Sequence, residues 1–165
     1  MKSIAIKHIR AIIRTSARIR SLKWVFIFNV EADTMRLKDR VVIVTGGASG
    51  IGKSISIKAA NEGARVVVAD IRETPLEGGQ NTVDAILKAG GISTYMNTDV
   101  TNDNDVKKLV ANTVKKYGFL DVIVNNAAAH GRAALLDTTE KEWDRVMAVG
   151  AKGMFSGVNM RLNKC

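Results

Sequence analysis

Strand-like and helical segments alternate along the chain from residue 41 onward. Four apolar or β-branched runs bounded by turn residues predict strands, at residues 41–45, 65–69, 93–98 and 121–125. Helical segments follow the first three runs, and the clearest covers residues 103–117, where one apolar stripe recurs every three or four positions. The first, second and fourth runs are almost continuously apolar, which is typical of strands buried on both faces. This alternation predicts right-handed crossovers, a parallel sheet and an α/β fold.

Residues typical of helix starts and helix ends mark the bounds of the other predicted helices. The first predicted helix extends to about Glu62, and the second covers residues 80–89. Thr139 and Glu142 form a capping-box pattern, which predicts the start of the last helix. The apolar side of that helix is predicted to consist of Trp143, Val146 and Met147.

A glycine-rich segment joins the first predicted strand to the first predicted helix. It reads Thr-Gly-Gly-Ala-Ser-Gly-Ile-Gly over residues 45–52. Gly46 permits a tight turn out of the strand, Gly50 lets the backbone approach a pyrophosphate, and Gly52 lets the helix pack close to the sheet. Free N–H groups at the start of the helix face an anion there, and the helix dipole favours its charge. The segment therefore predicts a dinucleotide site at this junction.

A carboxylate at the end of the second predicted strand completes the pattern. Asp70 follows Gly52 at the usual spacing of about 20 residues, where it can accept hydrogen bonds from the adenosine ribose hydroxyls. The same charge would repel the 2′-phosphate of NADP, and Ser49 brings no cation to neutralise that phosphate. Arg72 keeps NADP open as the alternative cofactor. These residues favour NAD over NADP.

Together, these segments resemble the cofactor motifs of the short-chain dehydrogenase/reductase family. Residues 45–52 match the family's TGxxxGxG motif, and Asp70 occupies the position of the ribose-binding Asp of NAD-preferring members. Asp99 and Val100 resemble the family's adenine-ring contact. The alternative for Asp99 is a capping role at the helix over residues 103–117.

The resemblance extends from residue 36 to about residue 160. Asn125–Ala128 resembles the family's NNAG motif with Ala in place of its last glycine, and residues 143–155 resemble the fourth helix of the family. The resemblance implies an architectural role for Asn125 and a cofactor contact for Asn126. The cofactor-binding residues predicted by motif and resemblance are Gly46, Ser49, Gly50, Ile51, Gly52, Asp70, Asp99, Val100, Asn126 and Ala127.

The fold implied by the resemblance is a Rossmann-like, doubly wound parallel sheet. This sequence would contain about four of its strands, in the order 3-2-1-4, and is therefore expected to be an incomplete α/β domain. Residues 35–165 would form the N-terminal NAD-binding portion, roughly half to two-thirds of a complete member. The fourth strand would then lie at an uncovered edge, which is an aggregation hazard.

The family's catalytic pattern is missing from the sequence. By resemblance, catalysis needs a Ser, a Tyr-x-x-x-Lys pair and an Asn. The two tyrosines, Tyr95 and Tyr117, are each followed four residues later by Asp, and Gly150 occupies the expected Asn position. With Gly153 and Gly157 nearby, the last helix is predicted to fray, since each glycine costs about 1 kcal/mol in a helix interior. No catalytic residue is assigned.

Composition narrows the class of protein. A length of 165 residues predicts one folded domain. One Cys and two His argue against a disulfide scaffold and against a His/Cys metal site. No membrane-spanning helix is predicted, because every apolar run is far shorter than the roughly 20 residues that such a helix needs.

The net charge of +9 is concentrated at the start of the chain. Residues 1–34 contain seven Lys or Arg and two acidic residues, whereas residues 35–165 contain 18 basic and 14 acidic residues. The mildly basic remainder gives no support for nucleic-acid binding. The basic leader is expected to be disordered or spurious, or else a transit peptide or a membrane-surface helix. The expected compartment is the cytoplasm, or an organelle if the leader is a transit peptide.

Three functions follow from these patterns. The first is an NAD(P)-dependent oxidoreductase that transfers hydride between nicotinamide and an alcohol or carbonyl, with this chain a catalytically incomplete fragment. That fragment is expected to bind the adenosine end of NAD weakly, whereas the small-molecule substrate and its turnover need a complete parent. The second is a non-catalytic NAD-binding or regulatory module, and the third is a basic protein that binds nucleic acid or membrane through residues 1–24. By resemblance the chain is also expected to form homo-oligomers.

Overall fold

The computed structural model describes residues 35–131 and 133–162. These residues form one compact unit. The predictions for the basic leader, residues 1–34, lie outside the described residues. No helix in the described part of the chain is both long enough and apolar enough to cross a membrane.

Four parallel strands form a single sheet, as predicted. Its order is β3-β2-β1-β4, so the predicted 3-2-1-4 order is confirmed. In register, Val42 of β1 pairs with Val66 on one side and with Val122 on the other. The strands are β1 (Val41–Thr45), β2 (Arg65–Asp70), β3 (Ile92–Asn97) and β4 (Val122–Val124).

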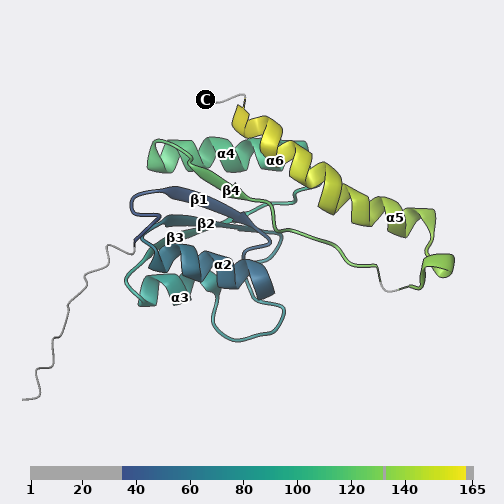
Figure 1. The fold of residues 1–165 in the computed structure, drawn as a ribbon, viewed down its shortest axis with the longest axis horizontal. Coiled ribbons are helices and arrows are strands. Elements are labelled where there is room, and N and C mark those ends of the chain that lie inside the picture. Colours follow the sequence, from purple (N-terminus) through teal and green to yellow (C-terminus); the bar gives the residue numbers. More distant parts are fainter. Residues whose placement is uncertain (1–34, 132, 163–165) are drawn as a thin grey trace, which may run out of the picture. The chain divides into compact units, whose positions relative to one another are not determined.

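Helices cover both faces of this sheet (Figure 1). One face is covered by α2 and α3, and the other by α4, against which α6 packs. The predicted helix over 103–117 is confirmed with both its ends, because Asn102 caps its start and Gly118 turns with φ +90° at its end. The helices are α2 (Gly50–Asn61), α3 (Thr82–Lys88), α4 (Asp103–Tyr117), α5 (Glu140–Met147) and α6 (Gly153–Leu162), with a 3₁₀ turn at Leu135–Asp137 and a π-helical turn at Ala148–Lys152.

Successive strand residues fill two separate apolar clusters. Val42 and Val44 point to one cluster, whereas Ile43 between them points to the other, because side chains alternate along a strand. Residues from the helices complete both clusters, for example Ile86 of α3 and Leu109 of α4. Each fully buried side chain of this kind contributes about 1.5–3 kcal/mol of hydrophobic free energy. This two-sided burial explains why β1 and β2 are continuously apolar in sequence.

The fourth strand is shorter than predicted. The predicted strand covers residues 121–125, but only its three apolar residues, Val122–Val124, pair with β1, and all three are half-buried. Asp121 instead uses its carboxylate to accept the N–H of Val41 at 2.8 Å and an Arg40 guanidinium hydrogen bond at 2.8 Å. This side chain ties the start of β1 to the start of β4, and β4 forms an edge of the described sheet.

The predicted fraying of the last helix stays a prediction, because the structure shows the helical path and not how often it opens. The chain passes through the π-helical turn and continues as α6 to Leu162. Two of the three glycines lie at close contacts: a Cβ on Gly153 would meet Val100 at 3.0 Å, and one on Gly157 would meet Asn125 at 2.6 Å. Packing of the glycine backbone against its neighbours therefore offsets the weak helix propensity.

The apolar side predicted for the preceding helix, α5, does not pack into the core. The start of α5 has one half of the predicted capping box: the N–H of Glu142 donates to the Thr139 hydroxyl at 3.2 Å, whereas the Glu142 carboxylate accepts hydrogen bonds from Arg145. No residue of α5 is buried, however, and Trp143 is 54% exposed. The apolar side predicted from the sequence is thus an exposed surface in the described part of the chain.

Candidate functional site

The glycine turn between β1 and α2 is closely packed on one side and open on the other. Gly46 adopts φ +64° at the turn out of β1, as its predicted role requires. A Cβ on Gly52 would overlap the carbonyl oxygen of Gly46 and lie 2.6 Å from the Asn126 amide. Gly50, at φ +50°, has no atom within 4 Å of the place where a Cβ would lie. The space beside the Gly50 Cα is therefore open, whereas the Gly50 N–H is bonded to the Glu77 carboxylate at 3.0 Å.

Thr45 and Asn126 join this turn to the end of β4. The Thr45 hydroxyl accepts the N–H groups of Asn126 and Ala127 at 3.0 and 3.1 Å, and donates to the Val124 carbonyl at 3.2 Å. The Asn126 amide donates to the Thr45 carbonyl at 3.0 Å and to the Gly46 carbonyl at 3.3 Å. Asn126 thus holds the glycine turn in place, and its predicted contact with a cofactor remains a prediction.

Asp70 lies at the carboxyl end of β2, beside the same turn. Its carboxylate accepts the N–H of Ala48 at 3.1 Å and the N–H of Arg72 at 3.4 Å. A carboxylate has about four acceptor positions, so these two bonds leave capacity for ribose hydroxyls. The half-buried carboxylate is therefore fixed next to the glycine turn, at the position expected for ribose binding.

Asp99 and Val100 follow β3 on the same edge of the sheet. Asp99 accepts the N–H and the hydroxyl of Thr101 at 2.8 and 2.7 Å. The alternative capping role for Asp99 is wrong, because the side chain that caps α4 is Asn102. Val100 lines a small gap of about 10 Å³ at the ends of β1 and β4, together with Thr45, Asn125, Ala127, Val149, Gly150, Gly153 and Met154.

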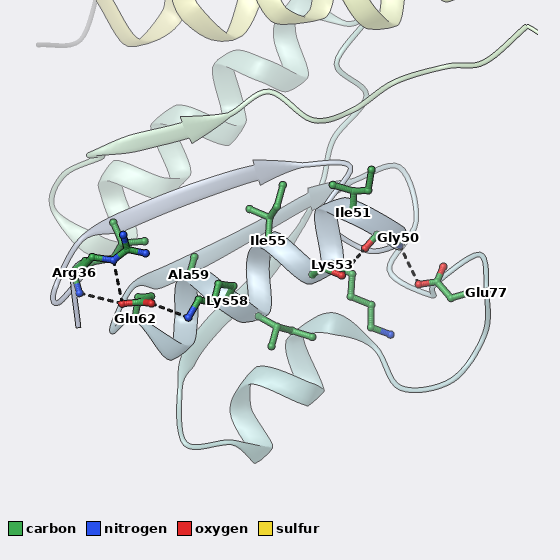
Figure 2. A pocket seen from close by; sticks show the side chains of 12 residues that line it. Arg36, Gly50, Ile51, Lys53, Ile55, Lys58, Ala59, Glu62 and Glu77 are labelled. Carbon is green, nitrogen blue, oxygen red and sulfur yellow. Dashed lines mark hydrogen bonds and ion pairs between the residues drawn. The ribbon is translucent and has the colours of Figure 1, made fainter. Parts of the chain in front are cut away.

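A groove of about 1040 Å³ extends along the exposed flank of α2 (Figure 2). Ile51, Ile55 and Ala59 line it, and a charged group lies at each end. At one end Glu62 pairs with Lys58 at 2.8 Å and with Arg36 at 3.7 Å. The hydrogen bond from Lys58 is the main reason why the pKa of the Glu62 carboxyl is lowered. The groove shares only Gly50 and Ile51 with the predicted cofactor residues.

Glu77 lies at the other end of this groove and contacts the first turn of α2. Its carboxylate accepts the N–H of Gly50 at 3.0 Å, and this bond is the main cause of its lowered pKa. Next to it, the N–H of Leu76 donates to the Ser49 hydroxyl at 2.8 Å, and the Lys53 ammonium donates to the Gln80 carbonyl at 2.7 Å. Sequence reasoning missed Glu77, because no motif links this loop to the glycine turn.

The predicted residues meet at the carboxyl edge of the parallel sheet. This edge, between β1 and β4, is where chain connections leave in opposite directions and where open α/β sheets bind ligands. The N–H groups of Ile51 and Gly52 belong to the first turn of α2 and so have no acceptor within the helix. These N–H groups, the open space beside the Gly50 Cα and the Asp70 carboxylate together fit a pyrophosphate linked to a ribose, while the Gly50 N–H itself is taken by the Glu77 carboxylate.

The comparisons with known proteins point to one family. Residues 40–164 match the family described as short chain dehydrogenase. The 3-oxoacyl-(acyl-carrier-protein) reductase FabG of Thermotoga maritima is 37% identical over 126 residues, which cover 76% of this chain and 50% of that protein. The secoisolariciresinol dehydrogenase of Forsythia intermedia is 38% identical over 122 residues, or 73% of this chain and 42% of that protein. The chain thus spans about half the length of these curated relatives.

Solved structures agree with this result. A short chain dehydrogenase from Mycobacterium avium superposes with a TM-score of 0.69 at 38% identity, covering 77% of this chain and 46% of that one. The part that matches the family includes the glycine turn, Asp70 and the end of β4. The sequence match, the strand order and the arrangement at the sheet edge agree, and this chain belongs to the short-chain dehydrogenase family.

Proposed function

We propose that residues 35–165 bind the adenosine and pyrophosphate of NAD as the cofactor-binding part of an oxidoreductase. The observation that supports this most directly is the Asp70 carboxylate, which accepts the Ala48 N–H within the glycine turn. Relatives of the matched part are named as a reductase and a dehydrogenase, which agrees with NAD(P)-dependent redox chemistry. When bound, the nicotinamide supplies the hydride donor or acceptor for an alcohol or carbonyl substrate.

The choice of NAD over NADP is part of the proposal. Asp70 would accept bonds from the 2′- and 3′-hydroxyls of the adenosine ribose, whereas a 2′-phosphate would meet its negative charge. Ser49 contributes a hydroxyl rather than a cation at the neighbouring position, and that hydroxyl already accepts a hydrogen bond from Leu76. The Arg72 guanidinium is the one nearby cation in the β2–α3 loop that favours NADP.

A fluorescence titration with NADH tests the proposal. We expect saturable binding by the full 165-residue chain and at least about a tenfold weaker affinity for Asp70→Ala, since hydrogen bonds to a charged group contribute about 1.5–3 kcal/mol each. Asp144→Ala, which removes an exposed carboxylate on α5, is the matched control and should bind like the wild type. Absence of binding at millimolar NADH by folded protein would contradict the proposal.

A non-catalytic NAD-binding module is the second candidate, and Gly150 favours it. Gly150 lines the gap at the ends of β1 and β4, where its lack of a side chain leaves no group to hold a water molecule. We expect the 165-residue chain to bind NADH without dehydrogenase turnover, because its sequence contains no Tyr-x-x-x-Lys. Turnover of any alcohol with NAD by this chain alone would exclude the module and show that other residues supply the chemistry.

A further inference from the structure

The loop after β2 holds a second carboxylate against the glycine turn. Three hydrogen bonds attach residues 76–80 to the start of α2: Leu76 N–H to Ser49 hydroxyl, Gly50 N–H to Glu77 carboxylate, and Lys53 ammonium to Gln80 carbonyl. The sequence separation is 27 residues in each case, so the loop folds back over the turn. Figure 2 shows the Glu77 carboxylate directed at Gly50. Glu77 is thus a fixed charge at the turn.

Asp70 and Glu77 contact backbone groups on opposite sides of Ser49. Asp70 accepts the N–H of Ala48, and Glu77 accepts the N–H of Gly50. These two N–H groups are two residues apart, a span of at most about 7 Å. A 2′-phosphate on a ribose bound to Asp70 would therefore enter a region with a carboxylate on each side of Ser49.

We propose that Glu77 is a second selectivity residue, which acts with Asp70 to disfavour dinucleotides that have a 2′-phosphate on the adenosine ribose. This inference rests on the proposed function, because it concerns the same dinucleotide site. NAD has neutral hydroxyls at this place and tolerates both carboxylates, whereas NADP adds a phosphate of about two negative charges. The pyrophosphate is common to NAD and NADP, so the Glu77 carboxylate at the Gly50 N–H repels it equally in both, whereas repulsion of the 2′-phosphate acts on NADP alone.

Lys53 at the start of α2 and Arg72 in the loop after β2 are cations that oppose the charge of Glu77. Lys53 lowers the pKa of Glu77 through its positive charge, but its ammonium donates to the Gln80 carbonyl. Arg72 has an exposed position two residues after Asp70. Counted along the sequence, Asp70, Glu73 and Glu77 outnumber Lys53 and Arg72, so the end of β2, its loop and the start of α2 together have a net charge of −1.

The test compares NADH and NADPH binding in the wild type and in Glu77→Gln. Gln keeps an oxygen that can accept the Gly50 N–H and removes only the charge, so the loop should stay attached. We expect the Kd for NADPH to fall about three- to tenfold further than the Kd for NADH, because NADH loses only the repulsion of its pyrophosphate. Adenosine 2′,5′-bisphosphate and 5′-AMP, which differ only in the 2′-phosphate, should show the same contrast as competitors of NADH.

Salt dependence and a remote variant separate a charge effect from a structural one. The NADPH gain of Glu77→Gln should shrink in 1 M NaCl, where the Debye length is about 3 Å. Glu140→Gln, which removes the same charge from the exposed start of α5, should leave both Kd values unchanged.

Each other outcome has a definite meaning. Equal changes for NADH and NADPH, or no change, would overturn the role of Glu77 while NADH binding by the wild type upholds the proposed function. An equal effect of Glu140→Gln would likewise overturn it, because the effect would then come from net charge. A wild type that binds neither dinucleotide would overturn both.

Discussion

Substitution of Gly52 by Ala tests how the glycine turn is built. The added Cβ would overlap the Gly46 carbonyl oxygen and lie 2.6 Å from the Asn126 amide nitrogen, a distance that real Cβ atoms do not show. Either α2 moves away from the turn, or the Asn126 amide leaves the two carbonyls it binds. Overpacking costs about 1–3 kcal/mol and the loss of two hydrogen bonds about 2 kcal/mol, so we expect Gly52→Ala to lower the free energy of unfolding by about 2–3 kcal/mol by either route, and by up to about 5 kcal/mol if both occur.

Urea unfolding followed by circular dichroism measures this loss. Gly50→Ala is the matched control, because its Cβ would meet no atom within 4 Å and the cost is limited to the strain of φ +50°, about 1–2 kcal/mol. We therefore expect a clearly larger loss for Gly52→Ala than for Gly50→Ala. If the two variants unfold at the same urea concentration, close packing at Gly52 is not what fixes the turn.

Three further predictions concern other buried groups. Thr45→Val keeps the shape but leaves the N–H groups of Asn126 and Ala127 without their acceptor, so chemical denaturation should show a loss of about 2–4 kcal/mol; a loss under about 1 kcal/mol would contradict it. The buried Tyr117 hydroxyl has no hydrogen-bond partner among the described residues, so Tyr117→Phe should keep or raise the melting temperature, and a fall of several degrees would refute this. The lowered pKa of Glu62 means that its stabilising contribution is present above its ordinary value near 4.5 and is lost as pH falls through the folded-state pKa. Glu62→Gln should therefore destabilise more at pH 7 than at pH 3, and an equal loss at both would contradict the ion pair with Lys58.

Most of the fold follows from local patterns in the sequence. The strand run at 65–69 and the stripe at 103–117 match β2 and α4 closely, because the apolar residues that each pattern marks are mostly buried. The last helix could not be predicted in the same way. Gly153 and Gly157 weaken a helix by propensity, but contacts with Val100 and Asn125, which lie far earlier in the chain, decide the outcome.

In the candidate site, too, residues within a local motif were predictable and residues that depend on contacts between distant segments were not. The glycine turn and Asp70 were predictable because their spacing follows from the geometry of one strand–turn–helix–strand unit. The roles of Thr45 and Glu77 were not, since the hydroxyl of Thr45 binds N–H groups in a segment distant in sequence, and Glu77 reaches back 27 residues from an irregular loop. Such contacts depend on the conformation that loops adopt against the folded sheet, and the spacing of residues within a local motif does not predict them.

The central position of β1 has a consequence for synthesis on the ribosome. Val42 pairs with Val66 of β2, which is made soon afterwards, and with Val122 of β4, which is made much later. At translation rates of about 5–20 residues per second, the roughly 80 residues that separate β1 from β4 take about 4–16 s to make. Throughout that interval the edge of β1 that pairs with β4 has no hydrogen-bond partners, and the apolar side chains of β1 next to it are not covered by β4. We therefore expect ribosome-associated chaperones to bind the nascent chain.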